Sequence, residues 1–329
     1  MGNQFEINPK VVEDVKVIWN IAKERELPIA IAVAQNFDTH APKKLRMYAN
    51  GGRIGTIPLN GNDLKYAIAK PRYNNTLYFD YLDQDARGRV SEYYAQADGQ
   101  RDILKEPEYL MDMCALTKGK YTSTQKDVKD EYAMAEKRLA TSKMLSKSEK
   151  KKAKGLVLCD IAYFMPPEWT GRKGKADFLC IDTAKGEIGL LTLKCRRAAC
   201  IDGEDEKENG LRDCFNQMSV AIVEHQDEVV RDCITRYNTL VDVGVIDGEK
   251  ADPSMEWKLF MGFIFYAAGD SEMRTKSDAV SICEQELMDT GKFAESRDTA
   301  AGTLDVRFMF TTNLHPDLDE MTSWEKFKN

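Results

Sequence analysis

The sequence predicts an α/β protein of two domains, in which a small α+β domain precedes a larger α/β domain. Three observations predict this: a length of 329 residues, a composition of 43% hydrophobic and 31% charged residues, and strand-like runs that alternate with helical segments in the second half. The polar segment from Thr122 to Gln125 places the boundary near residue 120. We therefore assign residues 1–120 to the first domain and residues 121–329 to the second.

The first domain is predicted from apolar runs that are separated by turn residues. Residues 9–25 place apolar side chains at helical spacing, and Asn50-Gly51-Gly52 between two apolar runs favours a β-hairpin. We expect strands at residues 27–34, 44–49, 53–59 and 76–81, and helices at residues 9–25, 62–70 and within 84–113. No catalytic constellation occurs here. The basic and aromatic strand residues are either ordinary surface residues or a surface that recognises a substrate or partner.

The second domain is predicted to order its elements as helix, three strands, helix, strand, helix, strand. The run at residues 257–268 is apolar and aromatic throughout, which is typical of a central strand buried on both faces. Residues 183–186 join the second and third strands as a hairpin. The expected helices are residues 126–150, 211–241 and 275–288, and the expected strands are residues 155–165, 175–182, 187–195, 257–268 and 306–312.

Charge, cysteine usage and hydropathy restrict the function classes. The net charge of −7 disfavours general nucleic-acid binding, although the basic segment Lys143–Lys154 is either a solvated helix end or a phosphate-facing patch. The eight cysteines include no CxxC pair, which argues against a structural zinc site, and Cys159, Cys180 and Cys195 lie in apolar runs, which is typical of reduced core thiols. No apolar run is long enough to cross a bilayer, and the N-terminus lacks a secretory signal. We expect a cytoplasmic protein without membrane contact.

Two residues on neighbouring strands of the second domain are the strongest candidates for chemistry. Asp177 lies in the apolar strand GKADFLCID, and Lys194 lies at the polar end of LLTLKCRR. Because side chains alternate along a strand, Thr192 and Lys194 share one face of the third strand. The hairpin should bring Asp177 to the same face. The sequence thus predicts an acid and an amine that point toward one shared site.

This arrangement, over residues 125–313, resembles the PD-(D/E)XK superfamily of nucleases with their restriction-endonuclease-like core. In that family an aspartate on one strand and a Glu-x-Lys motif on the next hold one or two Mg²⁺ ions beside the scissile phosphate, and Mn²⁺ can substitute. Asp177 matches the aspartate and Lys194 matches the lysine. The resemblance implies hydrolysis of DNA or RNA phosphodiesters, and some relatives act in restriction and phage defence.

Thr192 departs from the family pattern, because it stands where the acidic residue of the motif is expected. A neutral hydroxyl contributes no charge to Mg²⁺, which is usually anchored by one or two carboxylates. Carboxylates that could compensate are Asp160 on the first strand, Glu131 or Glu136 on the preceding helix, and Asp213 or Glu224 on the long helix. The resemblance implies catalytic roles for Asp160, Asp177, Thr192 and Lys194, metal ligation by Asp160, Asp177 and Glu136, and phosphate contacts from Arg196, Arg197 and Gln217.

Three hypotheses follow. The chain is a Mg²⁺-dependent nuclease with an impaired or migrated carboxylate, a degenerate member that binds nucleic acid or assembles with other proteins, or a structural protein whose domains contact a protein partner or another copy of the chain. Thr192 and the negative net charge favour the second and third hypotheses. Asp160, Asp177, Lys194 and the nearby basic residues favour the first and second.

Overall fold

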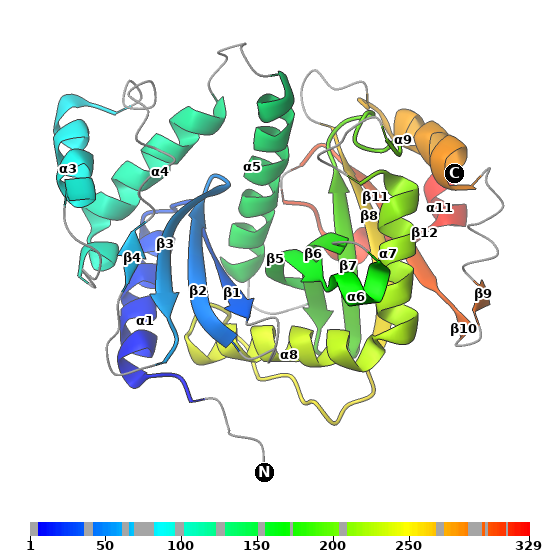
Figure 1. Ribbon diagram of the computed structural model, residues 1–329, viewed down its shortest axis with the longest axis horizontal. Coiled ribbons are helices and arrows are strands. Elements are labelled where there is room, and N and C mark those ends of the chain that lie inside the picture. Colours follow the sequence, from blue (N-terminus) through cyan, green and yellow to red (C-terminus); the bar gives the residue numbers. More distant parts are fainter. Residues whose placement is uncertain are drawn as a thin grey trace. The chain divides into compact units, whose positions relative to one another are not determined.

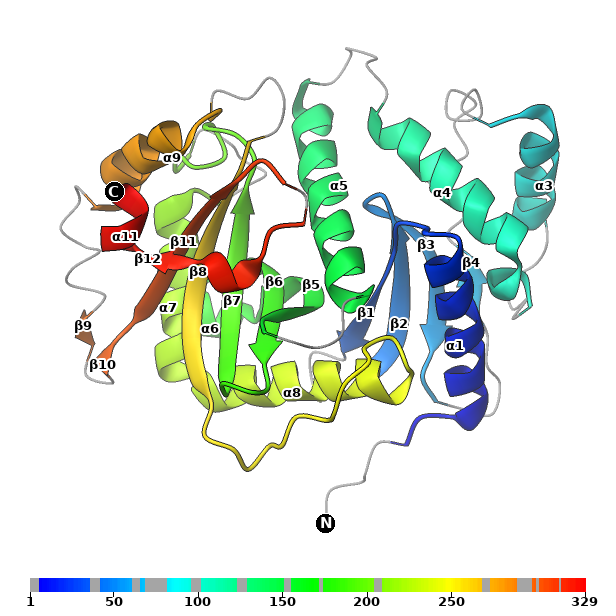
Figure 2. The same ribbon diagram turned by 180° about the vertical axis from the view of Figure 1, so that it is seen from behind.

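A computed structural model shows a mixed α/β protein that divides into two compact units (Figures 1 and 2). The first unit comprises Met1–Ala153 and Thr235–Lys250, and the second comprises Lys154–Ile234 and Ala251–Asn329. The structure describes residues 6–35, 42–60, 66–68, 82–95, 102–122, 129–150, 155–171, 174–203, 209–267, 273–288, 298–299, 302–313 and 315–329. Among these, no helix is both long enough and apolar enough to span a membrane.

An antiparallel sheet in the order β1-β2-β3-β4 forms the centre of the first unit. Its strands are β1 (Ile29–Gln35), β2 (Pro42–Ala49), β3 (Gly52–Pro58) and β4 (Ala67–Ile68). The predicted hairpin between β2 and β3 is confirmed, with positive φ angles of 45° at Asn50 and 81° at Gly51. The helix predicted at residues 62–70 is wrong at β4, because Ala67 and Ile68 pair with β3 and this pairing overrides the local helical pattern. The strand predicted at residues 76–81 lies outside the described residues.

Helices of the first unit cover this sheet and its open edge. They are α1 (Pro9–Glu24), α3 (Gln84–Ala95), the 3₁₀ helix η2 (Ile103–Lys105), α4 (Pro107–Thr122) and α5 (Lys129–Lys150). In α5 the buried carboxylate of Glu149 accepts hydrogen bonds of 3.1 and 3.3 Å from the backbone amide of Ile31 on β1. Lys150 donates to the carbonyl of Leu27. These contacts satisfy an edge strand, so α5 belongs to the first unit rather than beyond a boundary near residue 120.

A six-stranded mixed sheet in the order β12-β11-β8-β7-β6-β5 forms the centre of the second unit. Its strands are β5 (Val157–Met165), β6 (Gly174–Asp182), β7 (Glu187–Lys194), β8 (Lys258–Tyr266), β11 (Asp305–Thr311) and β12 (Thr322–Ser323). β7, β8 and β11 are parallel, whereas β5 and β6 run antiparallel to their neighbours. All five strands predicted for the second domain are present. The apolar run predicted to be central is β8, which lies between β7 and β11.

The remaining elements of the second unit are short helices and one additional strand pair. They are α6 (Pro167–Thr170), α7 (Leu211–Glu224), the first part of α8 (Gln226–Asp242), α9 (Lys276–Cys283), the π-helix η3 (Glu284–Met288), β9 (Asp298–Thr299), β10 (Gly302–Thr303), the 3₁₀ helix η4 (Leu318–Glu320) and α11 (Trp324–Lys328). The residues of α8 from Thr235 onward belong to the first unit. The single helix predicted at residues 211–241 is wrong, because the chain breaks at His225 with φ −129° and ψ 31°. The His225 ring stacks on Trp169 of α6 with centroids 4.3 Å apart, which gives the break a packing partner.

The two faces of this sheet are covered by different segments. Figures 1 and 2 show α7 on one face. α11 packs there as well, with Phe327 stacked on Phe308 of β11 at 5.6 Å. On the other face, a Cβ added to Gly262 of β8 would lie 2.4 Å from the Met321 methyl group, so the Met321 side chain of the segment that follows η4 packs closely over this glycine. The face under α7 carries the residues that the sequence predicts for chemistry.

Candidate functional site

The β6–β7 hairpin brings Asp177 and Thr192 together on the face under α7. Phe178 is paired with Leu191, so Asp177 lies directly opposite Thr192. The Thr192 hydroxyl donates to Asp177 Oδ2 at 3.1 Å, and the backbone amide of Leu193 donates to the same oxygen at 2.8 Å. Lys175 Nζ lies 3.3 Å from Asp177 Oδ1. A carboxylate that is 3% exposed is therefore held by an ammonium, a hydroxyl and an amide.

Lys194 lies on the same face, two residues beyond Thr192, and its residue is only 1% exposed. Its ammonium donates to the backbone carbonyl of Asn209, just before α7. The Asn209 side chain donates to Gln217 Oε1 at 3.1 Å, and the backbone amide of Lys175 donates to the same oxygen at 3.3 Å. Gln217 thus bridges Asn209, whose carbonyl accepts from Lys194, and Lys175, whose ammonium pairs with Asp177. Asp177 and Lys194 therefore lie on one face of the sheet, as the sequence predicts.

Two buried groups complete this polar cluster from α7. Cys214 Sγ lies 3.7 Å from the Thr192 hydroxyl and 3.5 Å from the Asn209 carbonyl oxygen. Gln217 Nε2 is buried without a hydrogen-bond partner among the described residues, so one amide donor of the cluster is unused. We refer to the group made by Lys175, Asp177, Thr192, Lys194, Asn209, Cys214 and Gln217 as the Asp177 cluster.

A tightly packed loop encloses the Lys194 side of the cluster. A Cβ added to Gly210 would lie 2.0 Å from Asp202 Oδ1, so the loop needs glycine at the start of α7. Burial raises the pKa of Asp202, the charge of Asp213 raises it further, and the ammonium of Lys194 opposes both effects. Asp202 therefore interacts electrostatically with Lys194, although strand alternation does not predict that these two residues are near each other.

Among the described residues, no group of metal ligands is assembled around Asp177. Asp160 is buried on β5, and its Oδ1 accepts a 2.8 Å hydrogen bond from the backbone amide of Ile161 beside a bulge in the strand. The side chain of Glu136 lies outside the described residues. Within the described part of the chain, no three His, Cys, Asp or Glu side chains group as metal ligands would. With a lysine and a threonine on Asp177, the residues present do not fit Mg²⁺.

The other predicted phosphate contacts lie beyond the end of β7. Arg196 and Arg197 are half-buried, and Arg197 donates to Gln285 Oε1 of the π-helix at 3.2 Å. Gln217 is the predicted phosphate contact that the structure brings into the Asp177 cluster. Lys175 was missed, although strand alternation places it on the face of Asp177 two residues earlier.

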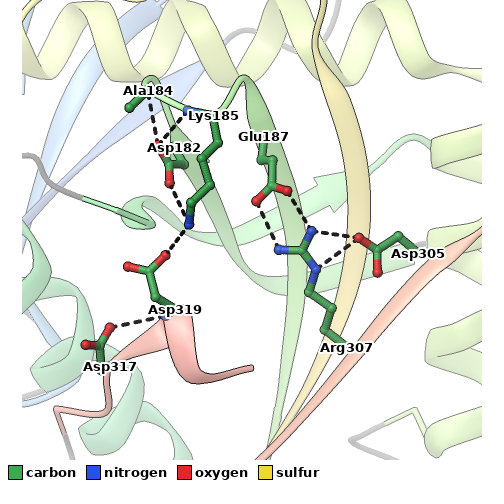
Figure 3. A network of polar contacts seen from close by, with 8 residues as sticks. All are labelled: Asp182, Ala184, Lys185, Glu187, Asp305, Arg307, Asp317 and Asp319. Atoms are coloured by element: carbon green, nitrogen blue, oxygen red, sulfur yellow. Dashed lines mark hydrogen bonds and ion pairs between the residues drawn. The ribbon is translucent and has the colours of Figure 1, made fainter. Parts of the chain in front are cut away.

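A second polar network occupies the opposite end of β6 and β7 (Figure 3). Lys185 in the hairpin turn lies between Asp182 and Asp319, at 3.3 and 2.8 Å. Arg307 of β11 makes two hydrogen bonds of 3.0 and 2.8 Å to Glu187 of β7, and it also pairs with Asp305 at 2.7 Å.

The guanidinium of Arg307 reaches Glu187 across the intervening strand β8. It lies 3.9 Å from the ring centroid of Phe260 on that strand. A cavity of about 280 Å³ adjoins this network, with Glu187, Asp305 and Arg307 in its wall. Those three charges are already paired with one another.

Comparisons with known proteins do not identify the chain. No protein-family model matches it, and neither the curated proteins nor the solved structures give a significant match. The geometry of the Asp177 cluster is therefore the basis on which a function can be proposed.

Proposed function

We propose that the second unit is a degenerate nuclease-type module of the PD-(D/E)XK kind that binds nucleic-acid phosphate at the Asp177 cluster without cleaving it. The observation that carries this proposal is the ion pair between Lys175 and Asp177 at 3.3 Å. In a Mg²⁺-dependent nuclease this carboxylate would have to bind the metal. Here it is engaged by an ammonium group, and Thr192 adds no second carboxylate.

The charge of the Asp177 cluster supports the binding of an anion. Within the Asp177 cluster, two ammonium groups, from Lys175 and Lys194, accompany the single carboxylate of Asp177, and Asp202 outside the cluster also interacts with Lys194. A phosphodiester carries one negative charge and offers only hydrogen-bond acceptors. The unused Nε2 donor of Gln217 is suited to such an oxygen.

Access to the cluster is provided through Lys175, whose side chain is 39% exposed. A phosphate that reaches it can exchange with the Asn209 carbonyl as the acceptor for Lys194. That exchange replaces a neutral acceptor by an ionised one, and hydrogen bonds to ionised groups are roughly twice as strong. The exchange would therefore give the Lys194 ammonium a stronger hydrogen bond than the carbonyl provides.

A second candidate function is Mg²⁺-dependent cleavage of nucleic acid. It is favoured by the placement of Asp177 and Lys194 on one face of adjacent strands, the arrangement that this chemistry requires. Asp160 and a helical glutamate such as Glu136 are its candidate compensating acids. The same experiment separates the two candidates.

The test measures binding and cleavage of labelled DNA and RNA oligonucleotides in Mg²⁺ and in a chelator. We expect binding that weakens with salt, persists in the chelator and is not accompanied by cleavage. Lys194→Met should weaken binding roughly tenfold and reduce the salt slope by about one, because one charged phosphate contact is lost. Lys185→Met is the matched control, since Lys185 lies in the network at the other end of the hairpin.

Two results would overturn the proposal. Absence of nucleic-acid binding at every salt concentration would leave a protein-partner or homo-oligomer role. Cleavage that requires Mg²⁺ or Mn²⁺ and disappears in Asp177→Asn would establish the second candidate instead.

A further inference from the structure

An exposed aromatic side chain stands beside the Asp177 cluster. Phe164, near the end of β5, is 44% exposed. It is paired directly with Lys175 of β6. Because opposed residues of antiparallel strands project to the same face with Cβ atoms about 5 Å apart, Phe164 and Lys175 are neighbours on the face of Asp177.

The position of Phe164 distinguishes it from ordinary surface residues. A single exposed apolar side chain needs no explanation by itself. Among the described residues, Phe164 and Val17 are the large apolar side chains that remain exposed, and Val17 lies on α1 of the first unit. Phe164 instead adjoins the half-exposed ammonium of Lys175, which pairs with Asp177.

We infer that the Asp177 cluster binds single-stranded nucleic acid, with one base stacked on Phe164 and the adjoining phosphate held by Lys175 and Lys194. This inference rests on the proposed function and specifies its substrate class. A ring beside a cation is the arrangement by which proteins hold an unpaired nucleotide, because the ring contacts the face of a base while the cation contacts the backbone. In a duplex the faces of the bases are covered by their neighbours, so Phe164 has nothing to stack on.

Phe164 stands on an edge strand of its sheet. β5 is the terminal strand in the order β12-β11-β8-β7-β6-β5, so no further strand of this sheet pairs beside Phe164. The chain leaves β5 through Pro166 and Pro167 into α6, where Trp169 is stacked on His225.

The experiment compares one oligonucleotide sequence as a single strand and as a duplex, by fluorescence anisotropy at equal salt. We expect tighter binding of the single strand. Phe164→Ala should weaken single-strand binding about 5- to 100-fold, which is the range that loss of one stacked base produces, and should leave duplex binding unchanged. Phe164→Tyr should retain the affinity, since its ring still stacks.

Val17→Ala is the matched control, because Val17 is 45% exposed and distant in sequence from the Asp177 cluster. It should leave both affinities unchanged, and thermal melting of each variant verifies folding. Equal binding of the single strand and the duplex, with no effect of Phe164→Ala, would overturn this inference and leave the proposed function standing. Absence of binding to either form would overturn both.

Discussion

The two ends of the β6–β7 hairpin both carry buried acids and bases, but they use them differently. At the turn, Lys185 and Arg307 each lie between two carboxylates, and Glu187 receives two hydrogen bonds from Arg307 (Figure 3). At the other end, Lys194 donates to a neutral carbonyl, and Gln217 keeps an unused amide donor. At the first end Lys185 and Arg307 both have ionised partners, although Asp182 Oδ2 makes no hydrogen bond, whereas the second end keeps an ammonium on a neutral acceptor and an amide donor that a ligand can use.

This difference indicates which charges hold the fold and which serve a ligand. A buried charge with a geometrically good partner costs several kcal/mol to unpair, whereas a buried charge without one is itself a cost to stability. Protein interiors normally satisfy their polar groups, so a buried cluster with an orphan amide needs an explanation. Binding of an anion supplies one.

The largest effect is expected for Thr192→Glu, which restores the acid that the resemblance leads one to expect. A second carboxylate would face Asp177 where residue 192 is 1% exposed, so we predict a loss of about 3 kcal/mol in the free energy of unfolding in a chelator. Mg²⁺ should recover most of that loss, about 2.7 kcal/mol at a hundred times its Kd, because only the folded protein would bind it. Urea unfolding with and without Mg²⁺ measures both changes.

Thr192→Val is the control for this variant, since it removes the hydroxyl bond to Asp177 without adding charge. It should cost about 1 kcal/mol and show no response to Mg²⁺. If the resemblance extends to catalysis, Thr192→Glu also gains Mg²⁺-dependent cleavage. If Thr192→Glu folds but its free energy of unfolding does not change with Mg²⁺, the site lacks more than one of the residues that metal binding requires.

A smaller effect is expected at the opposite end of the hairpin for Arg307→Met. The side chains of Arg307 and Glu187 are only 20% and 18% exposed, so removal of the guanidinium leaves a largely buried carboxylate without its partner. We predict a loss of about 2 kcal/mol in the free energy of unfolding at neutral pH. Nucleic-acid affinity should not change, because the cluster proposed to bind it lies at the other end of the strands. A loss of nucleic-acid affinity in Arg307→Met would show that both ends of the hairpin belong to one binding site.

The pH dependence of this loss is a second measurement on the same variant. Hydrogen bonds from Arg307 lower the pKa of Glu187 below its ordinary value of 4.5, against the opposing effect of burial. A lowered folded-state pKa contributes stability that is present above pH 4.5 and is lost as the pH falls through the folded value. The stability difference between wild type and Arg307→Met should therefore shrink in acid. A difference that stays constant down to pH 3, below the ordinary pKa of 4.5 for this carboxyl group, would assign the loss to packing on Phe260 instead.

Much of the second unit could be predicted from the sequence, because its strands are long apolar runs bounded by turn residues. The face shared by Asp177, Thr192 and Lys194 followed from alternation along two strands and one hairpin turn. Cys159, Cys180 and Cys195, expected as core residues, are buried, and so are the other five cysteines, all of them free thiols. These features follow from the order of apolar and polar residues within short segments, which the sequence shows directly.

Contacts between distant segments could not be predicted in the same way. The break at His225 depends on stacking with Trp169, which lies on another element. The pairing of β4 with β3 and of Arg307 with Glu187 likewise joins segments whose proximity no local pattern encodes. In the Asp177 cluster, alternation along β6 is enough to predict the position of Lys175. The position of Asn209 beside Lys194 instead depends on the path of the loop before α7, which no local pattern predicts.

The smallest expected change gives the most direct test of the contrast between the two ends. In the absence of nucleic acid, Lys194→Met should stay within about 1 kcal/mol of the wild-type free energy of unfolding, because it replaces a buried ammonium held by a neutral carbonyl with an apolar chain of similar length. Urea unfolding of Lys194→Met beside Arg307→Met makes this measurement. A loss for Lys194→Met as large as that for Arg307→Met would show that Lys194 supports the fold, and would contradict its assignment to a ligand.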